Sequence, residues 1–424
     1  MIKFLIKGLV RDHHRSLFPI IIVAIGVWIT VFMQSYLEGI FGDMLDSTAR
    51  FSTGHVKVMT RAYAENRDQK PNDLALLGVN QIMDKLQQQY PEVTWVKRIQ
   101  FGGLLDIPGE NGETLSQGPV IGLGIDLLSP DNPEIGILNI KKAVTAGRLP
   151  RNPGEILISE ILAKKLDIKL GDTATLLSST MYGSMTMYNF TVVGTVRFGM
   201  AAMDRGAMIA DIRDVQRALD MTDAAGEILG FLEDRLYHDE VAAAIAGEFN
   251  GNYLQSEDEY APVMGTLKEL SILGEYTALA ENFSGIIILI FVMIMSIVLW
   301  NAGLLGGLRR YGEVGIRLAI GEPKGHVYQS MLYESVFIGL VGSIIGTALG
   351  LGSAYWLQVK GLDIGSLMKN VNMMMPMVLR STITPETYYI GFFPGLFSTV
   401  LGTALSGIGI YRRQTAQLFR ELES

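Results

Sequence analysis

Apolar residues in this chain of 424 residues gather into four long runs, one near the N-terminus and three in the last third. The runs cover residues 17–37, 283–305, 327–357 and 388–411. Each run supplies the ~20 apolar residues that a helix needs to cross a hydrocarbon core about 30 Å thick. The pattern therefore predicts four transmembrane helices, arranged one plus three, with a largely polar insertion at residues 38–282.

The insertion has the pattern of a folded mixed α/β domain. Short runs rich in β-branched and aliphatic residues predict strands, and segments with helical periodicity separate them. The expected strands are residues 55–60, 120–125, 155–159, 173–177, 190–196, 207–210 and 228–232, and the expected helices are residues 79–90, 160–166, 212–219 and 241–249. We expect two subdomains, one built from both ends of the insertion and the other from its middle.

Both ends of the insertion carry an apolar stripe with helical spacing. Five apolar residues from Leu37 to Leu45 fall at i, i+3, i+4, i+7 and i+8, and Val263, Leu267 and Leu270 form a similar stripe. We interpret these stripes as helical stalks that join the insertion to the first and second membrane helices. The alternative is that they are packed juxtamembrane helices.

The charge is distributed unevenly. The chain has 35 Lys and Arg against 43 Asp and Glu, a net charge of −8, yet basic residues gather in segments 1–16, 306–326 and 412–424. The positive-inside rule places these three segments in the cytoplasm, and the insertion and the loop at 358–387 outside. Segment 1–16 alternates apolar and basic residues, which predicts an amphipathic helix on the membrane surface. The acidic remainder argues against nucleic acid, and anionic lipid accounts for the basic clusters.

Several kinds of chemistry are excluded. The chain has no cysteine, so it forms no disulfide and has no catalytic thiol. It contains no G-x-x-x-x-G-K-[ST] phosphate-binding loop, and its five histidines lack metal-ligand spacing. We therefore expect no catalytic residue, no metal site and no cofactor on this chain. The first apolar run is too long for a signal peptide and lacks a cleavage site, so we expect a retained anchor.

Three glycines form a stripe in the third apolar run. Gly342, Gly346 and Gly350 recur every four residues, a small-x-x-x-small pattern that lets another helix approach closely. The partner is either another helix of the same chain or a second copy across a dimer seam.

A methionine cluster lies in the predicted external loop at 358–387. It consists of Met373, Met374, Met375 and Met377. Thioethers are flexible and polarizable, and they suit surfaces that accept varied apolar partners. Contact with lipid or acyl chains is one interpretation, and simple interfacial packing is the other.

The segment between the second and third runs carries the most specific motif. Residues 309–321 read R-R-Y-G-E-V-G-I-R-L-A-I-G. This resembles the R-x-x-E-I-G-I-R-K-A-L-G signature of ABC transporter permeases of the MacB/LolC/LolE/FtsX superfamily, in which a short coupling helix docks on an ATPase. The matching residues are Glu313, Gly315, Arg317, Ala319 and Gly321, and the departures are Leu318, where a basic residue is common, and Glu322-Pro323, where small residues usually follow.

The resemblance extends into the insertion. Gly-Arg-Leu-Pro at 147–150, Gly-Glu-Ile-Leu-Ile-Ser at 154–159 and Leu-Gly-Asp at 170–172 are similar to the core of that family's periplasmic domain. The resemblance implies a non-catalytic permease of the bacterial inner membrane, with both termini cytoplasmic and the large domain periplasmic. It also implies a second permease copy or paralogue, and a separate ATPase that binds ATP and Mg²⁺.

The family leaves three roles open. The sequence carries no fused ATPase, the insertion is large, and the methionine cluster suits acyl chains, so we favour lipoprotein release of the LolC/LolE kind. The alternatives are MacB-like efflux of peptides or drugs through an adaptor and outer-membrane duct, and FtsX-like regulation of an external cell-wall hydrolase.

Overall fold

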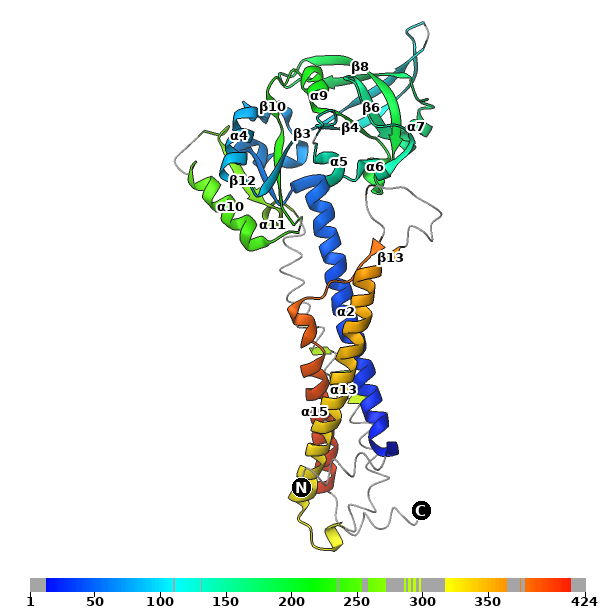
Figure 1. Cartoon of the computed structure of the whole chain (residues 1–424), viewed down its shortest axis with the longest axis vertical. Helices are drawn as coiled ribbons and strands as arrows, with labels where there is room; N and C mark the ends of the chain where they lie inside the picture. The colour runs from blue at the N-terminus through cyan, green and yellow to red at the C-terminus, as the bar shows by residue number, and fades with distance from the viewer. Residues whose placement is uncertain are drawn as a thin grey trace. The chain divides into compact units, whose positions relative to one another are not determined.

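The structure is a computed structural model, shown in Figure 1. It describes residues 13–109, 111–130, 132–234, 236–253, 258–271, 317–363, 374 and 378–412, with seven further helical positions between 286 and 298. The chain divides into two compact units. The helical unit comprises residues 1–42, 277–362 and 378–424, and the α/β unit comprises residues 43–276 and 363–377.

Three long helices make up the described part of the helical unit: α2 (His13–Thr48), α13 (Lys324–Lys360) and α15 (Phe392–Arg412). Among the described residues, Leu17–Thr53, Lys324–Lys360 and Pro385–Leu405 are long and apolar enough to cross a membrane. They correspond to the first, third and fourth apolar runs. The second run, 283–305, lies mostly outside the described residues, and the count of four spans stays a prediction. A short 3-10 turn, η4 (Pro385–Tyr388), precedes α15.

Helix α2 runs through the predicted end of the first span without a break and continues to Thr48 in the α/β unit. A short π-helix, η1 (Ala49–Thr53), follows it directly. The α/β unit therefore begins on the same helix as the first membrane span.

The stripe predicted at the other end of the insertion is wrong in part. Val263 lies in strand β12 (Pro262–Thr266), opposite Met59 of β1 (Val56–Thr60). Helix α11 (Leu267–Leu270) begins only after Thr266, where Thr266 and Glu269 form a reciprocal capping box that fixes the helix start. The three apolar residues span a strand-to-helix junction, so their helical spacing is accidental. Residues 272–285, in which that stalk would continue, lie outside the described residues.

The α/β unit is organised around a ten-stranded sheet in the order β12-β1-β11-β3-β4-β9-β6-β8-β5, with β7 pairing to both β3 and β8. Its further strands are β3 (Val93–Pro108), β4 (Thr114–Ile125), β5 (Val144–Gly147), β6 (Glu155–Ser159), β7 (Thr173–Ser179), β8 (Met185–Val196), β9 (Ala207–Asp211) and β11 (Glu227–Leu232). Because β7 bridges β3 and β8, strands β3-β4-β9-β6-β8-β7 close into a six-stranded barrel. Strands β11, β1 and β12 extend the sheet from β3 (Figure 1).

Helices and short pairs complete this unit. They are α3 (Arg61–Glu65), α4 (Val79–Gln89), α5 (Glu134–Ile137), α6 (Ile140–Ala143), α7 (Glu160–Lys165), α8 (Ala201–Asp204), α9 (Ile212–Ala218), α10 (Asp239–Gly251), the 3-10 turns η2 (Arg67–Gln69) and η3 (Asn72–Leu74), and the strand pair β2 (Leu76–Leu77) with β10 (Ala224–Ala225). Of the remaining pair, β13 (Leu362–Asp363) with β14 (Val378–Leu379), only Asp363 belongs to this unit.

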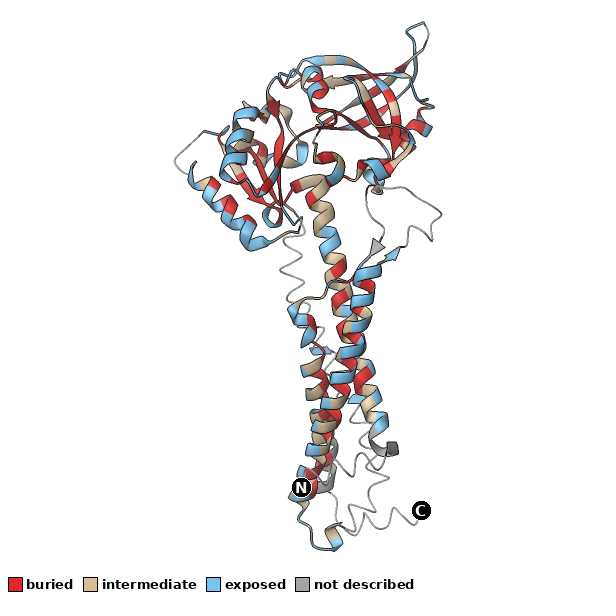
Figure 2. Ribbon diagram, viewed as in Figure 1, coloured by how far each residue is buried: buried red, intermediate tan, exposed pale blue. Residues whose placement is uncertain are grey.

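Alternation along the strands separates the barrel interior from its outer face. Leu105, Leu176 and Phe190 are almost fully buried in the main core, whereas Leu104 is 43% exposed on the opposite side of β3. This is the two-residue period of a β-strand. Figure 2 shows the buried positions concentrated along the strands of the sheet.

The predicted strands and helices of the insertion all have counterparts, but β3 was missed. It is the longest strand, 16 residues, and it pairs with β11, β4 and β7. The strands from the two ends of the insertion do lie together as β12-β1-β11. Because β3 joins this group to the barrel, the sheet is continuous, and the division into two subdomains stays a prediction.

Candidate functional site

The described part of the predicted coupling segment ends in a helix stop that requires glycine. Arg317–Ala319 are helical, and Gly321 has φ +96°. The Gly321 N–H donates to the Leu318 carbonyl at 3.1 Å, and the Glu322 N–H donates to the Arg317 carbonyl at 3.0 Å. These two bonds define a Schellman motif, in which glycine is the residue that tolerates the left-handed position. Glu313 and Gly315 lie outside the described residues.

Leu318 anchors the coupling segment to α13. It packs with Met331 against Val327, which is 1% exposed. This packing explains why position 318 is leucine, although a basic residue is common there in the family pattern. The next apolar residue, Ile320, is 79% exposed at the turn. This exposed isoleucine lies beside the predicted coupling segment, and sequence reasoning did not single it out.

The glycine stripe of α13 accommodates a ridge of α2 in the same unit. Val23, Val27 and Val31 of α2 are each 0% exposed. A Cβ on Gly342 would lie 2.7 Å from Val23 Cβ, and one on Gly350 would lie 2.6 Å from Val31 Cβ. The structure thus places a helix of the same chain against this stripe, at a separation that no larger residue permits.

Helix α15 covers the same valine ridge from another direction. A Cβ on Gly391, the residue before α15, would lie 2.7 Å from Val31 Cγ2, and one on Gly395 of α15 would lie 2.5 Å from Val27 Cγ2. The ridge is therefore enclosed by glycines of two helices, and we call this arrangement the glycine groove. Figure 2 shows the buried positions facing one another along α2, α13 and α15.

Hydrogen bonds connect α2, α13 and the segment before α15 beyond the groove. The Thr382 N–H donates to the Ser35 carbonyl at 2.9 Å. The Ser381 hydroxyl donates to the Ala354 carbonyl at 2.6 Å, and Trp28 Nε1 donates to Ser353 Oγ at 3.1 Å. Polar contacts therefore join α2 and α13, and each of them to the segment before α15, in addition to the glycine groove.

The first and last strands of the α/β unit are neighbours. Strands β1 and β12 pair in antiparallel fashion, with Val56 opposite Thr266, and the Leu267 N–H donates to the His55 carbonyl at 3.0 Å. The strands nearest the two ends of residues 43–276 are thus side by side.

His55 is fixed at this edge as a neutral imidazole. Its Nδ1 accepts the Leu232 N–H at 3.0 Å, and its ring lies against Phe231 and Tyr237. Burial is the main cause that lowers the pKa of His55 to about 4, and the carboxylate of Asp234 opposes that shift only in part. An imidazole that accepts a backbone hydrogen bond must be unprotonated on that nitrogen.

Two known protein families match this chain. Residues 16–248 match the family described as the MacB-like periplasmic core domain. Residues 285–415 match the FtsX-like permease C-terminal family. The chain belongs to the MacB/LolC/FtsX family of ABC transporter permeases.

Named relatives of this permease include three proteins. It is 24% identical over 252 residues to the lipoprotein-releasing system transmembrane protein LolC of Xylella fastidiosa strain Temecula1, covering 57% of this chain and 56% of LolC. It is 31% identical over 99 residues to the ABC transporter permease YknZ of Bacillus subtilis, covering 23% of this chain and 25% of YknZ. It is 32% identical over 98 residues to the macrolide export ATP-binding/permease protein MacB of Escherichia coli K12, covering 23% and 15%. The permease therefore aligns with about half the length of LolC and less of the others.

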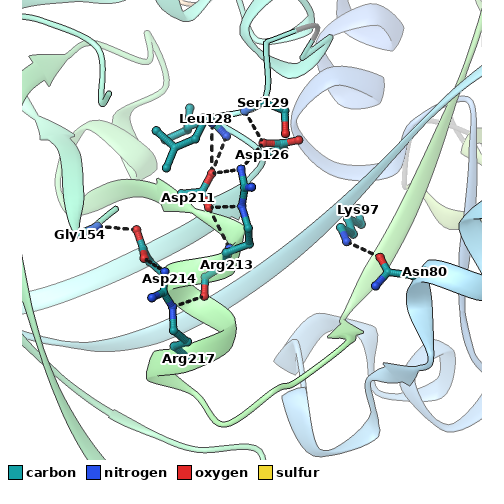
Figure 3. A network of polar contacts seen from close by, with 11 residues as sticks. Asn80, Lys97, Asp126, Leu128, Ser129, Gly154, Asp211, Arg213, Asp214 and Arg217 are labelled. Atoms are coloured by element: carbon teal, nitrogen blue, oxygen red, sulfur yellow. Dashed lines mark hydrogen bonds and ion pairs between the residues drawn. The ribbon is translucent and has the colours of Figure 1, made fainter. Parts of the chain in front are cut away.

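The periplasmic-core motif residues of this permease have structural roles. Arg148 donates two hydrogen bonds to Glu155, both at 2.7 Å, and these bonds are the main cause that lowers the pKa of Glu155. Gly154 has φ +80°, and its N–H donates to Asp214 Oδ2 at 2.6 Å. Figure 3 shows this bond beside the network around Asp211. These carboxylates hold backbone and arginine groups in place.

Among the predicted methionine cluster only Met374 lies in the described residues. It is 1% exposed and belongs to an apolar cluster of the α/β unit. Its N–H donates to the Arg197 carbonyl at 2.9 Å. Met373, Met375 and Met377 lie outside the described residues.

The described residues contain no group of three or more His, Cys, Asp or Glu side chains able to hold a metal ion. The features that stand out in them are packing features: a capped coupling segment, a glycine groove and a pair of adjacent strands.

Proposed function

We propose that this permease is the membrane subunit of an ATP-driven transporter that transmits mechanical displacement to an external domain. ATP and Mg²⁺ are bound and hydrolysed on a separate ATPase subunit, and two permease copies or paralogues act together. The coupling segment at 306–326, with Glu313, Gly315, Arg317, Ala319 and Gly321, is the docking site for that ATPase.

One observation carries the proposal: a continuous series of close contacts leads away from the coupling segment. Leu318 packs on α13, the α13 glycines enclose the α2 valine ridge, and α2 continues without a break into the α/β unit. Rigid helices in contact can pass a displacement between two arrangements. These links are packing contacts and one continuous helix, and the proposed transmission requires no polar channel through the membrane.

The proposed topology follows the charge distribution. Both termini and the coupling segment lie in the cytoplasm, and the α/β unit and the loop at 358–387 lie in the periplasm of a bacterium, with the spans in the inner membrane. The match to a periplasmic core domain family supports this orientation.

For the cargo we propose lipoproteins of the inner membrane. The alignment with LolC covers 57% of this chain, whereas the alignment with E. coli MacB covers 23%. MacB-like efflux of peptides or drugs is the second candidate, supported by the local identity of 32% to that exporter.

The test is mild-detergent purification of the tagged native protein, followed by mass spectrometry of everything retained. An ATPase together with a triacylated lipoprotein that ATP releases supports lipoprotein release. An ATPase with a periplasmic adaptor supports efflux, and an ATPase with a cell-wall hydrolase supports regulation. Absence of any ATPase under several mild conditions contradicts the permease mechanism.

A further inference from the structure

Arg98 joins three segments at the place where α2 meets the sheet. It lies in β3 and is 0% exposed, and its partner Glu134, the first residue of α5, is 1% exposed. Arg98 Nε donates to Glu134 Oε1 at 2.7 Å and Nη2 donates to Oε2 at 2.8 Å. The remaining nitrogen, Nη1, donates to the Arg50 carbonyl of η1 at 2.5 Å.

The Arg50 carbonyl is available because α2 ends in a π-helix. In an α-helix it would accept the Gly54 N–H, and in a π-helix the His55 N–H. The Gly54 N–H instead donates to the Ala49 carbonyl at 2.8 Å, and the His55 N–H donates to a carbonyl of β11 at 2.8 Å. The guanidinium therefore satisfies a buried acceptor that the end of the helix leaves open.

An apolar cluster reinforces the same junction. It contains Ala49 of η1, Val96 of β3, Ile137 of α5 and Leu267 of α11, with Leu45 of α2 packed against it. The segments that meet at the guanidinium thus also meet through side chains next to it. Through Leu267, the junction between β12 and α11 at the other end of the insertion also contacts this cluster.

We propose that Arg98 is the positioning residue that makes the end of α2 and the sheet of the α/β unit move as one body. This inference rests on the proposed function. A buried ion pair requires desolvation of both charges, and apolar side chains of similar volume often serve stability as well or better. Apolar packing does not fix the relative orientation of the segments that it joins. The directional hydrogen bonds from Arg98 to Glu134 and to the Arg50 carbonyl do fix the orientation of η1 relative to β3 and α5.

The first test measures rigidity in the full chain, without ATPase or cargo. The chain has no native cysteine, so spin labels can be placed at M44C, near the end of α2, and at Y182C, on the barrel. Both side chains are exposed, at 42% and 72%. For the wild type we expect double electron–electron resonance to give one narrow distribution of distances between the two labels. In the double variant R98M/E134L, which lacks the ion pair, this distribution should be about twofold wider.

A matched control is the pair Arg148–Glu155, also bidentate at 2.7 Å but formed within the segment 148–155, with neither residue bonded to η1. R148M with E155L should leave the distribution narrow. R98K, which keeps the charge and loses the planar fork, should widen it partially. If R98M/E134L fails to fold, R98K alone provides the test. An unchanged distribution in R98M/E134L or in R98K overturns the proposal.

The second readout is transport in lipid vesicles with the ATPase that co-purifies. R98M/E134L should retain ATP hydrolysis and lose about 2- to 30-fold in cargo released per ATP, the range expected for a change in coupling. Equal loss of hydrolysis and release, or no loss of either, overturns the role in transmission. If the wild-type chain binds no ATPase, the proposed function fails, while the spin-label distances still decide whether the joint is rigid.

Discussion

The backbone of Gly346 approaches Ala24 so closely that a Cβ on the glycine would lie 2.5 Å from the Ala24 carbonyl oxygen. That oxygen belongs to helix backbone, so it cannot move aside as the end of a flexible side chain would. The contact makes the separation of α13 and α2 depend on the absence of a single methyl group. The proposed transmission path from α13 to α2 therefore requires glycine at position 346.

Replacing Gly346 with alanine should therefore destabilise the helical unit. Overpacking of this kind typically costs about 1–3 kcal/mol, which outweighs the gain of about 1 kcal/mol in helix propensity. G352A in the same helix is the matched control, because nothing lies within 4 Å of a Cβ there. Denaturant titration in detergent micelles should give opposite signs for the two variants, and equal effects would contradict the close contact.

Replacing Ile320 with aspartate should weaken ATPase binding. The side chain is 79% exposed at the capped end of the coupling segment, so the substitution should not disturb the fold. A charge placed in an apolar contact at the centre of an interface should reduce co-purified ATPase by about tenfold or more. I161D on α7 changes an isoleucine that is 47% exposed in the α/β unit and should leave ATPase recovery unchanged. If I320D retained the full amount of ATPase, the docking surface would lie elsewhere.

His55 should make the α/β unit less stable as the pH falls below 6.5. Its pKa is lowered from 6.5 to about 4, so the unfolded chain binds a proton in this range that the folded protein excludes. Stability therefore rises with pH between about 4 and 6.5, and going from pH 7 to pH 5 should cost about 2 kcal/mol. The pKa of Glu155 is lowered from 4.5, so its contribution is lost only at more acidic pH.

The check on this prediction is thermal unfolding of the full chain at pH 5 and pH 7. In H55N the amide oxygen can accept the Leu232 N–H in place of Nδ1, and the variant carries no titrating group. It should lose most of the pH dependence between these two values. Equal slopes in the wild type and H55N would assign the pH dependence to other groups.

Met374 offers a way to separate the two interpretations of the methionine cluster. It is 1% exposed and packed within the α/β unit, so M374S should lower stability by about 2 kcal/mol or more. M187S is the control, because Met187 is 68% exposed and its replacement should change stability by less than about 0.5 kcal/mol. An unchanged melting temperature in M374S, with reduced capture of lipoprotein, would instead indicate that this residue contacts cargo.

Local pattern predicted much of the insertion. Strand β6 has the expected bounds Glu155–Ser159, and α4 and α9 each differ from the prediction by one residue. These elements are short and have clear propensities and turns at both ends. Strand β3 was missed although its first half is rich in β-branched residues; its second half, around Gly102 and Gly103, lacks that enrichment. Pairing with β4 and β7 makes it a strand there.

Three of the four apolar runs coincide with helices long enough to span a membrane, and the family predicted from short motifs is confirmed. These features could be predicted because the length of an apolar run and a short motif are local properties of the chain. The partner of the glycine stripe, the burial of Met374 and the junction at Arg98 were decided only by tertiary structure. Val23 and Gly342, or Arg98 and Glu134, are distant in sequence and meet only in the folded chain. A single sequence specifies that such residues are small, apolar or charged, and packing alone determines which of them come into contact.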